Sequence, residues 1–147
     1  MSARARAALA GAAAATAWAA VEPIDQRLFA SDYSDVALLG KWVTRSRWWP
    51  LAGLALHALN GATFGLGFYE VQLRTQREPR RLAFALAMAE HVALYPLAYL
   101  VDARHPARGT RGVPPLLTNG RAFAQATARH AVFGFLLGRW AMGRGRS

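Results

Sequence analysis

Three of the four histidines lie near the middle of three different apolar stretches, each about as long as a membrane span. His57 lies within residues 48–69, His91 within 82–101 and His130 within 122–142. An ionisable side chain inside a membrane-length helix is costly, so three at similar depth indicate a polar site or a polar packing contact. Imidazole binds zinc, iron or haem and titrates near pH 6.5, so the chemistry open to these residues is metal, haem or proton binding.

Two charged residues directly precede two of these histidines, namely Glu90 before His91 and Arg129 before His130. An arginine at the centre of a span costs on the order of 2.5–3.5 kcal/mol on insertion scales, so it needs a partner. We expect Glu90 to pair with Arg129, and Glu22, at the end of the first apolar stretch, is a second candidate partner.

The predicted polar cluster therefore contains His57, Asn60, Glu90, His91, Arg129, His130 and Glu22. Asn60 belongs to it because it shares the helical face of His57. Two interpretations stay open at this point. The cluster either locks a helix bundle mechanically, or it binds a divalent metal, a haem or protons, with His57, His91 and His130 as the metal ligands.

Motifs of familiar catalysts are missing from the chain. It has no cysteine, which excludes disulfides, cysteine-ligated metals and thiol nucleophiles. It also has no nucleophile elbow, no phosphate-binding loop and no H-E-x-x-H zinc motif. No catalytic residue is assigned, and an enzyme is the less favoured class.

Four apolar stretches, residues 7–22, 48–69, 82–101 and 122–142, organise the chain. About twenty residues cross the roughly 30 Å hydrocarbon core, so we predict an all-α membrane protein with a single four-helix transmembrane domain over 1–147. The first stretch is ambiguous, because Arg4, Arg6 and the pattern Ala17-Trp18-Ala19 are also typical of a cleavable signal peptide.

An internal repeat favours retention of the first stretch. Trp18 and Pro23 align with His91 and Pro96, and the second and fourth stretches share the pattern H-A-x-x-G-x-x-x-G. The chain is then a helical hairpin used twice, related by a pseudo-twofold axis along the membrane normal. Chance similarity in a chain rich in alanine and glycine is the alternative.

The shared pattern places four glycines at helix-packing positions. They are Gly61, Gly65, Gly134 and Gly138. Two glycines four residues apart let helix backbones approach closely in lipid, and each pair begins one turn after a histidine, on the same face. We therefore expect the histidines to point toward partner helices.

A short amphipathic helix is predicted in the first connection, over Val36–Val43, lying on the surface. Asp32 and Asp35 precede this helix, and their carboxylates can cap its N-terminal end or interact with its dipole.

The basic charge of the chain lies in short arginine clusters between the apolar stretches. The net charge is +10, while 54% of the residues are hydrophobic and the mean hydropathy is +0.11. Such clusters suit anionic lipid headgroups, and no nucleic-acid-binding motif is present. The positive-inside rule favours cytoplasmic termini in a multi-pass inner-membrane protein. Homo- and hetero-oligomers are both left open.

A family resemblance rests on three short motifs. They are His57 followed by Phe64, Gly67 and Tyr69, His91 followed by Pro96, and His130-Ala131-Val132-Phe133. With these the chain resembles small bacterial inner-membrane proteins of the YagU and YqhR type. The resemblance covers the last three apolar stretches. It implies a multi-span inner-membrane protein and a link to acid or envelope stress, and it supplies no site residues.

Overall fold

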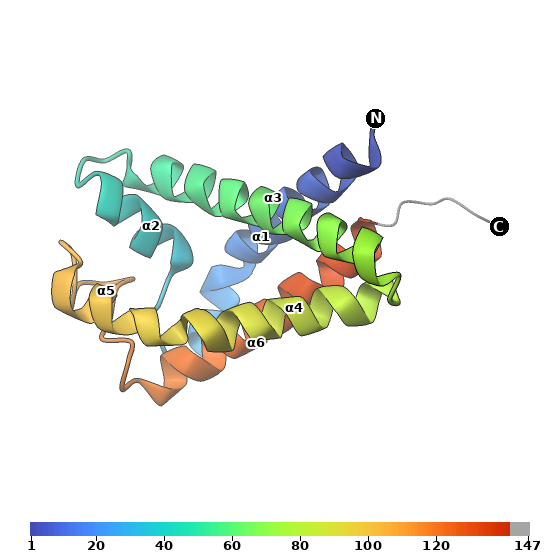
Figure 1. Cartoon of the computed structure of the whole chain (residues 1–147). Coiled ribbons are helices and arrows are strands. Elements are labelled where there is room, and N and C mark those ends of the chain that lie inside the picture. The colour runs from blue at the N-terminus through green and yellow to red at the C-terminus, as the bar shows by residue number, and fades with distance from the viewer. Residues whose placement is uncertain (142–147) are drawn as a thin grey trace.

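The computed structural model describes residues 1–141, and this part of the chain is helical (Figure 1). Its elements are α1 Ala3–Leu28, α2 Asp35–Val43, α3 Trp49–Thr75, α4 Pro79–Leu94, a 3-10 turn Tyr95–Leu97, α5 Ala98–Arg104 and α6 Gly120–Trp140. The all-α prediction is confirmed for the described residues.

Local sequence explains where the long helices begin and break. The Glu78 carboxylate accepts hydrogen bonds from the backbone N–H groups of Arg80 and Arg81, which caps α4. Pro79 then occupies the first turn, where its missing N–H is not needed. At the other end Pro96 cannot donate to the helical ladder, and the backbone tightens into the 3-10 turn between α4 and α5.

The helices form two antiparallel hairpins. The α1 helix pairs with α3, and α4 pairs with α6, while α2 packs on α3. The α1–α6 and α3–α4 contacts that join the hairpins are less extensive. In Figure 1, α3 and α4 approach each other at the turn that links them and diverge away from it, with α2 and α5 at the divergent end.

The predicted glycines lie where the helices of each hairpin touch. A Cβ on Gly61 would collide with the carbonyl oxygen of Gly11, and one on Gly65 with that of Ala7. A Cβ on Gly134 would come within 2.8 Å of the Phe84 Cα, and one on Gly138 within 2.7 Å of the Arg80 Cα. Each of these contacts in the second hairpin has an equivalent contact in the first hairpin. The equivalent residues are separated in sequence by the same offset that aligns Trp18 with His91. The two hairpins therefore use the same packing.

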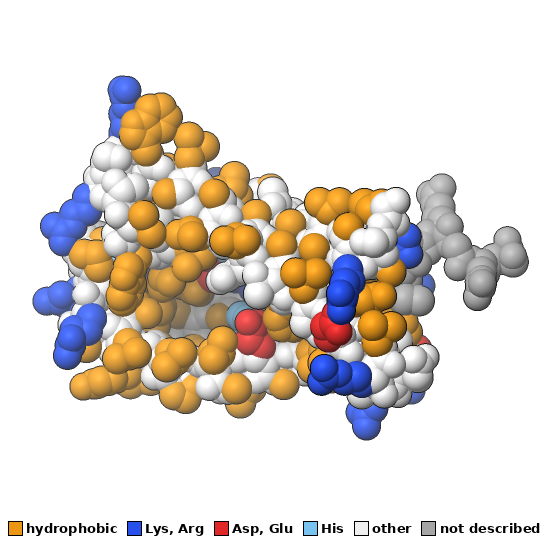
Figure 2. Space-filling view, turned by 45° about the horizontal axis from the view of Figure 1, so that its top comes forward, with side chains coloured by type: hydrophobic (Ala, Val, Ile, Leu, Met, Phe, Trp, Pro, Cys, Tyr) orange, Lys and Arg blue, Asp and Glu red, His pale blue; other side chains and the backbone are white. Residues whose placement is uncertain are grey.

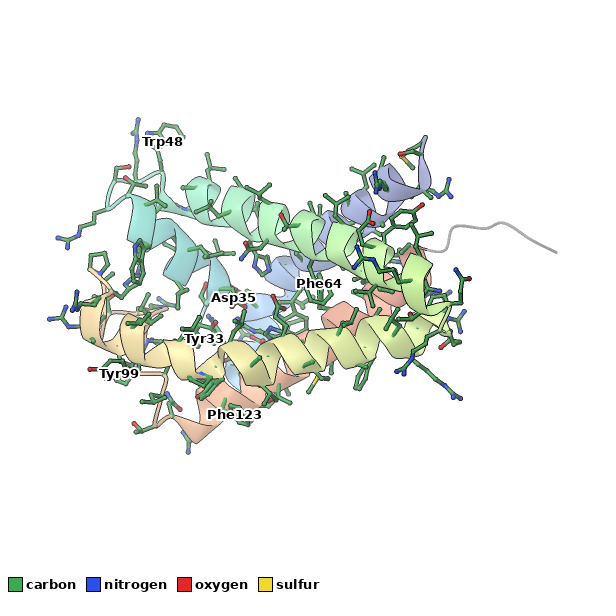
Figure 3. All side chains as sticks on the ribbon, viewed as in Figure 1. Tyr33, Asp35, Trp48, Phe64, Tyr99 and Phe123 are labelled. Atoms are coloured by element: carbon green, nitrogen blue, oxygen red, sulfur yellow. The ribbon has the colours of Figure 1, made fainter. Side chains whose placement is uncertain are left out.

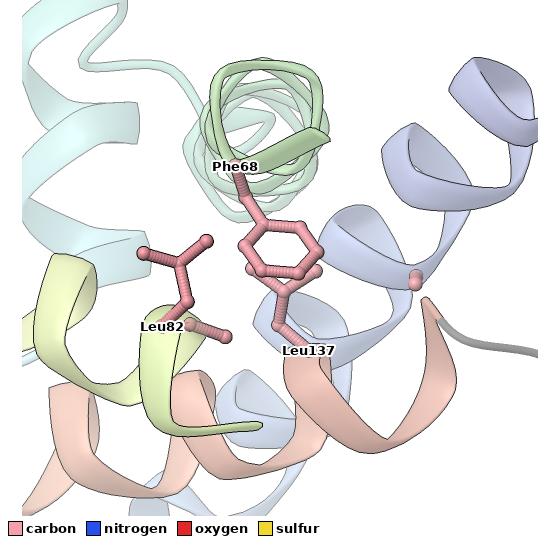
Figure 4. Close-up of a cluster of buried hydrophobic side chains, with 5 residues drawn as sticks. Phe68, Leu82 and Leu137 are labelled. Carbon is pink, nitrogen blue, oxygen red and sulfur yellow. The ribbon is translucent and has the colours of Figure 1, made fainter. Parts of the chain in front are cut away.

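A buried hydrophobic cluster joins the hairpins beside the α3–α4 turn. Phe68, Leu82 and Leu137 come from α3, α4 and α6 and meet there, as Figure 4 shows. Ala10 of α1 completes the contact, and small side chains such as Ala83 let the helices close around it. The cluster closes this end of the bundle.

Three helical segments are long and apolar enough to cross a membrane, namely Ala3–Leu28, Trp49–Thr75 and Pro79–Arg104. The fourth predicted span corresponds to α6, which is long but not among them, because Gln125, Arg129 and His130 lower its apolar character. Hydrophobic side chains spread over the middle of the face in Figure 2, while Lys and Arg gather toward its two ends. This distribution is compatible with a multi-pass membrane protein.

Candidate functional site: a cavity between the two hairpins

Arg129 of α6 is the centre of a buried ion cluster. Its side chain is 3% exposed. The Nε and Nη2 atoms donate to the two oxygens of Asp25 at 2.6 and 2.9 Å, and Nη1 donates to Asp35 Oδ2 at 2.6 Å. Glu22 Oε1 lies 3.4 Å from Nη1. One guanidinium thereby connects α6 with α1 and with the first turn of α2.

Hydrogen bonds hold the carboxylates of this cluster in place. Gln125 donates to Asp25 at 2.9 Å, and Ser34 Oγ donates to Glu22 at 2.7 Å. The Tyr33 hydroxyl donates to Asp35 at 2.5 Å. The Tyr33 and Trp18 rings also flank the guanidinium carbon, at 5.0 and 5.6 Å from their centroids. The buried positive charge of Arg129 is therefore balanced by carboxylates and hydrogen bonds that surround it.

The expected Glu90–Arg129 pair is wrong, and the second candidate, Glu22, is a partner. Glu90 lies instead beside His130, with 3.8 Å between Glu90 Oε2 and His130 Nε2. Asp25 and Asp35 are partners that the sequence prediction missed. The reason is that α1 continues beyond Glu22 to Leu28, and the segment after it folds back against α6 rather than running along the surface.

The short helix predicted at Val36–Val43 exists as α2, but it packs on α3 rather than lying apart from the bundle. Its N-cap is Ser34, whose hydroxyl accepts from Ala37 N–H at 3.0 Å. Asp35 follows the cap and uses its carboxylate for Arg129, while Asp32 accepts from Gly112 N–H. The helix is therefore capped by Ser34 rather than by Asp32 or Asp35, while Asp35 lies in the first turn of α2, where a carboxylate interacts favourably with the helix dipole.

Neighbouring groups fix the charge states of Asp35 and Tyr33 in this cluster. Burial by itself raises the pKa of Asp35, but the Arg129 guanidinium, together with His57 and the Tyr33 hydroxyl, offsets this and holds that pKa below its ordinary 3.8. Burial, followed by the nearby Asp35 carboxylate, raises the pKa of Tyr33 well above 10. Asp35 is consequently ionised and Tyr33 is a neutral donor at neutral pH.

His91 and His130 lie against each other between α4 and α6, with ring centroids 4.7 Å apart. His91 Nε2 is 2.9 Å from Thr127 Oγ1, whose own proton goes to the Phe123 carbonyl, so the imidazole is the donor. His130 Nδ1 lies 2.8 Å from the Ala126 carbonyl and must donate to it. The His130 Nε2 that faces Glu90 is then the nitrogen free to take up a proton.

The predicted metal centre of His57, His91 and His130 is not formed. Across residues 1–141 no group of three His, Asp or Glu side chains is placed to hold a metal ion. His91 and His130 each use one ring nitrogen for a hydrogen bond to α6. The two rings share a packing contact instead.

The predicted polar residues converge on a cavity of about 320 Å³ between the hairpins. Its polar lining comes from His57, Asn60, Glu90 and His130, with Tyr33, Asp35 and Arg129 on the cluster side. Its apolar lining comes from Ala15, Trp18, Leu38, Leu39, Gly61, Phe64, Leu94 and Phe133. Figure 3 shows Tyr33, Asp35 and Phe64 in the space between the two hairpins. His91 and Glu22 do not belong to this lining.

The cavity lies at mid-depth and opens on the flank of the bundle. Asn60, Glu90 and His130 each lie near the middle of the helical segment that carries them. Figure 2 shows a hollow on the long side of the molecule, rimmed by hydrophobic side chains, with a histidine and acidic side chains visible in it.

Several polar groups of the lining lack protein partners. His57 Nε2 and Trp18 Nε1 are buried without a hydrogen bond. The Glu90 carboxylate makes no hydrogen bond to any residue in the described part of the chain, and the Glu90 side chain is 39% exposed. Unsatisfied polar atoms are uncommon in a finished core and are typical of sites that receive a ligand.

Comparison with protein-family models, curated proteins and solved structures finds no match to the chain.

Proposed function

We propose that this chain is an integral membrane protein that binds a small, largely apolar molecule in the cavity between its two hairpins. The observation that carries the proposal is the 320 Å³ cavity, in which a few polar groups from several helices converge on an apolar and aromatic lining. Ligand sites are generally concave and mostly apolar, with a small number of placed polar groups. Membrane helix bundles build such sites between facing helices.

The proposal includes α6 as a fourth span. Its length of 21 residues corresponds to about 31 Å of helix, enough for the hydrocarbon core. Phe123, Val132 and Phe135 are exposed on its outer side, while Gln125 and Arg129 are buried against α1. A helix with apolar residues outward and satisfied polar residues inward is compatible with lipid.

The proposed setting is the bacterial inner membrane, with both termini in the cytoplasm. Arg74, Arg77, Arg80 and Arg81 lie at the α3–α4 end of the bundle, where α1 also begins and α6 ends. Arginine density at this end agrees with the positive-inside rule and with contacts to anionic headgroups. Membership of the YagU and YqhR type stays a prediction.

The Arg129 cluster has a structural role in this account. The hydrogen-bonding atoms of the Arg129 guanidinium are occupied by Asp25, Asp35, Glu22 and the Tyr33 carbonyl. It therefore has little capacity left for a ligand, and it fixes α6 to α1 and α2 on one side of the cavity.

Proton binding by the same lining is a second candidate function. It is favoured by the Glu90–His130 pair, because His130 Nε2 is free to accept a proton and lies 3.8 Å from a carboxylate in the cavity. No metal or haem role is proposed.

Calorimetric titration of the protein in lipid nanodiscs with neopentylbenzene, a small neutral probe, tests the main proposal. We expect saturable binding that is lost in Asn60→Phe, because the larger ring fills the cavity. The matched control is the neighbouring Leu59→Phe, whose side chain is 62% exposed outside the cavity. Equal uptake by both variants, or uptake no different from empty nanodiscs, would refute a specific cavity site.

A further inference from the structure

We infer that the ligand of this cavity is a lipophilic cation, such as a small amine or quaternary ammonium group attached to an apolar body. This inference rests on the proposed function and names the ligand class for the same site. It is carried by three features of the cavity: a carboxylate without a hydrogen-bond partner among the described residues, an aromatic lining and a lateral opening.

The first feature is the charge balance around the cavity. The positive charge of Arg129 is already enclosed by three carboxyl groups, those of Glu22, Asp25 and Asp35. Glu90 on α4 is a fourth acidic group, and its ion-pair neighbour is His130, with 3.8 Å between Glu90 Oε2 and His130 Nε2. Acidic groups therefore outnumber the arginine, so the field in the cavity favours a cation over an anion.

The second feature is the aromatic part of the cavity lining. Phe64 of α3 and Phe133 of α6 pack edge to face, with centroids 5.2 Å apart, and both line the cavity. Aromatic faces attract quaternary ammonium groups, and the attraction grows when water is excluded. An apolar body of the ligand would also contact Leu94 and Ala15, which line the same space.

The third feature is the route of entry. The hollow opens on the flank of the bundle between α3 and α4, and its rim is hydrophobic (Figure 2). In a membrane this flank faces lipid, so a ligand would enter sideways from the bilayer. A lipophilic cation partitions into the membrane, whereas a hydrophilic ion such as sodium does not, and for this reason the geometry favours an organic cation.

The test compares two probes of the same shape that differ only in charge. Benzyltrimethylammonium carries a quaternary nitrogen where neopentylbenzene has a carbon atom. Both are titrated calorimetrically into the protein in nanodiscs of zwitterionic lipid, and into Glu90→Gln and the control Glu70→Gln. Glu70 is an acidic residue of α3 that pairs with Arg4, away from the cavity.

We expect the cation to bind at least about tenfold more tightly than the neutral probe, and Glu90→Gln to remove this preference. Glu70→Gln should keep the preference. Equal affinities of the two probes for the unmodified protein, or a preference that survives Glu90→Gln, would overturn the cation assignment while the cavity function stands. Failure of both probes to bind would overturn the proposed function as well.

Discussion

Arg129 shows how a single buried charge sets the local structure. A guanidinium inside a bundle needs several acceptors, and here it takes them from α1, from the segment at Tyr33 and from α2. The sequence predicted the need for a partner and offered Glu22, which is correct. Asp25 and Asp35 could not be identified, because their approach depends on how the connection after α1 folds back. The spacing Glu22-x-x-Asp25, one helical turn on one face, was the available signal.

A double-mutant cycle tests the Asp25–Arg129 pair. Arg129→Met should lower the free energy of unfolding in detergent by about 3–5 kcal/mol, because it leaves buried carboxylates uncompensated. Combining it with Asp25→Asn should cost less than the sum of the single changes. The cycle with Glu90→Gln serves as the control and should be additive. Additivity for Asp25 together with coupling for Glu90 would contradict the cluster.

Asp35 gives the cluster a pH dependence. Its pKa in the folded protein lies below the ordinary value of 3.8, so its contribution to stability is complete above that value and is lost as the pH falls through the folded-state pKa. Each unit of lowering corresponds to about 1.4 kcal/mol. Thermal unfolding should show Asp35→Asn to be less stable than the unmodified protein at pH 7, with a gap that narrows below about pH 4. A gap independent of pH would argue against an ionised Asp35.

The helices pair, α1 with α3 and α4 with α6, through close contact between their backbones. Gly61 and Gly65 pack on α1, and Gly134 and Gly138 on α4, as the small-residue spacing predicted. The exact pairing partners were not readable, because many alanines could have served equally well. The break at Pro96 was also missed, although a proline inside a span is a known cause of such a break.

The glycine contacts lead to a prediction with an internal control. Gly61→Ala should destabilise the protein by about 1–3 kcal/mol, because the added methyl group meets the Gly11 backbone and the Ala15 side chain. Gly67, on the same helix, has no atoms within 4 Å of an added Cβ. Gly67→Ala should therefore be neutral or slightly stabilising. Equal losses in chemical unfolding would contradict the α1–α3 packing.

At the scale of the whole molecule, the sequence predicted helices, apolar stretches and the polar residues that meet between them. His57, Asn60, Glu90 and His130 do line one cavity, because they lie at similar depths on helices that pack together. The metal centre was not correct, since residue spacing does not fix how the imidazoles are placed relative to one another, and no metal-binding group of three forms among residues 1–141. The cavity itself was unpredictable, because it depends on the divergence of the two hairpins rather than on any motif.

The central claim, that the hairpins enclose a ligand cavity at mid-depth, can be tested directly because the chain has no native cysteine. Asn60→Cys places a thiol in the cavity, and Leu59→Cys places one on the outer surface of α3. In liposomes, a small trimethylammonium methanethiosulfonate should modify position 60 faster than position 59, and benzyltrimethylammonium should slow the reaction at position 60 alone. Equal reactivity at the two positions, without protection by the cation, would contradict the account.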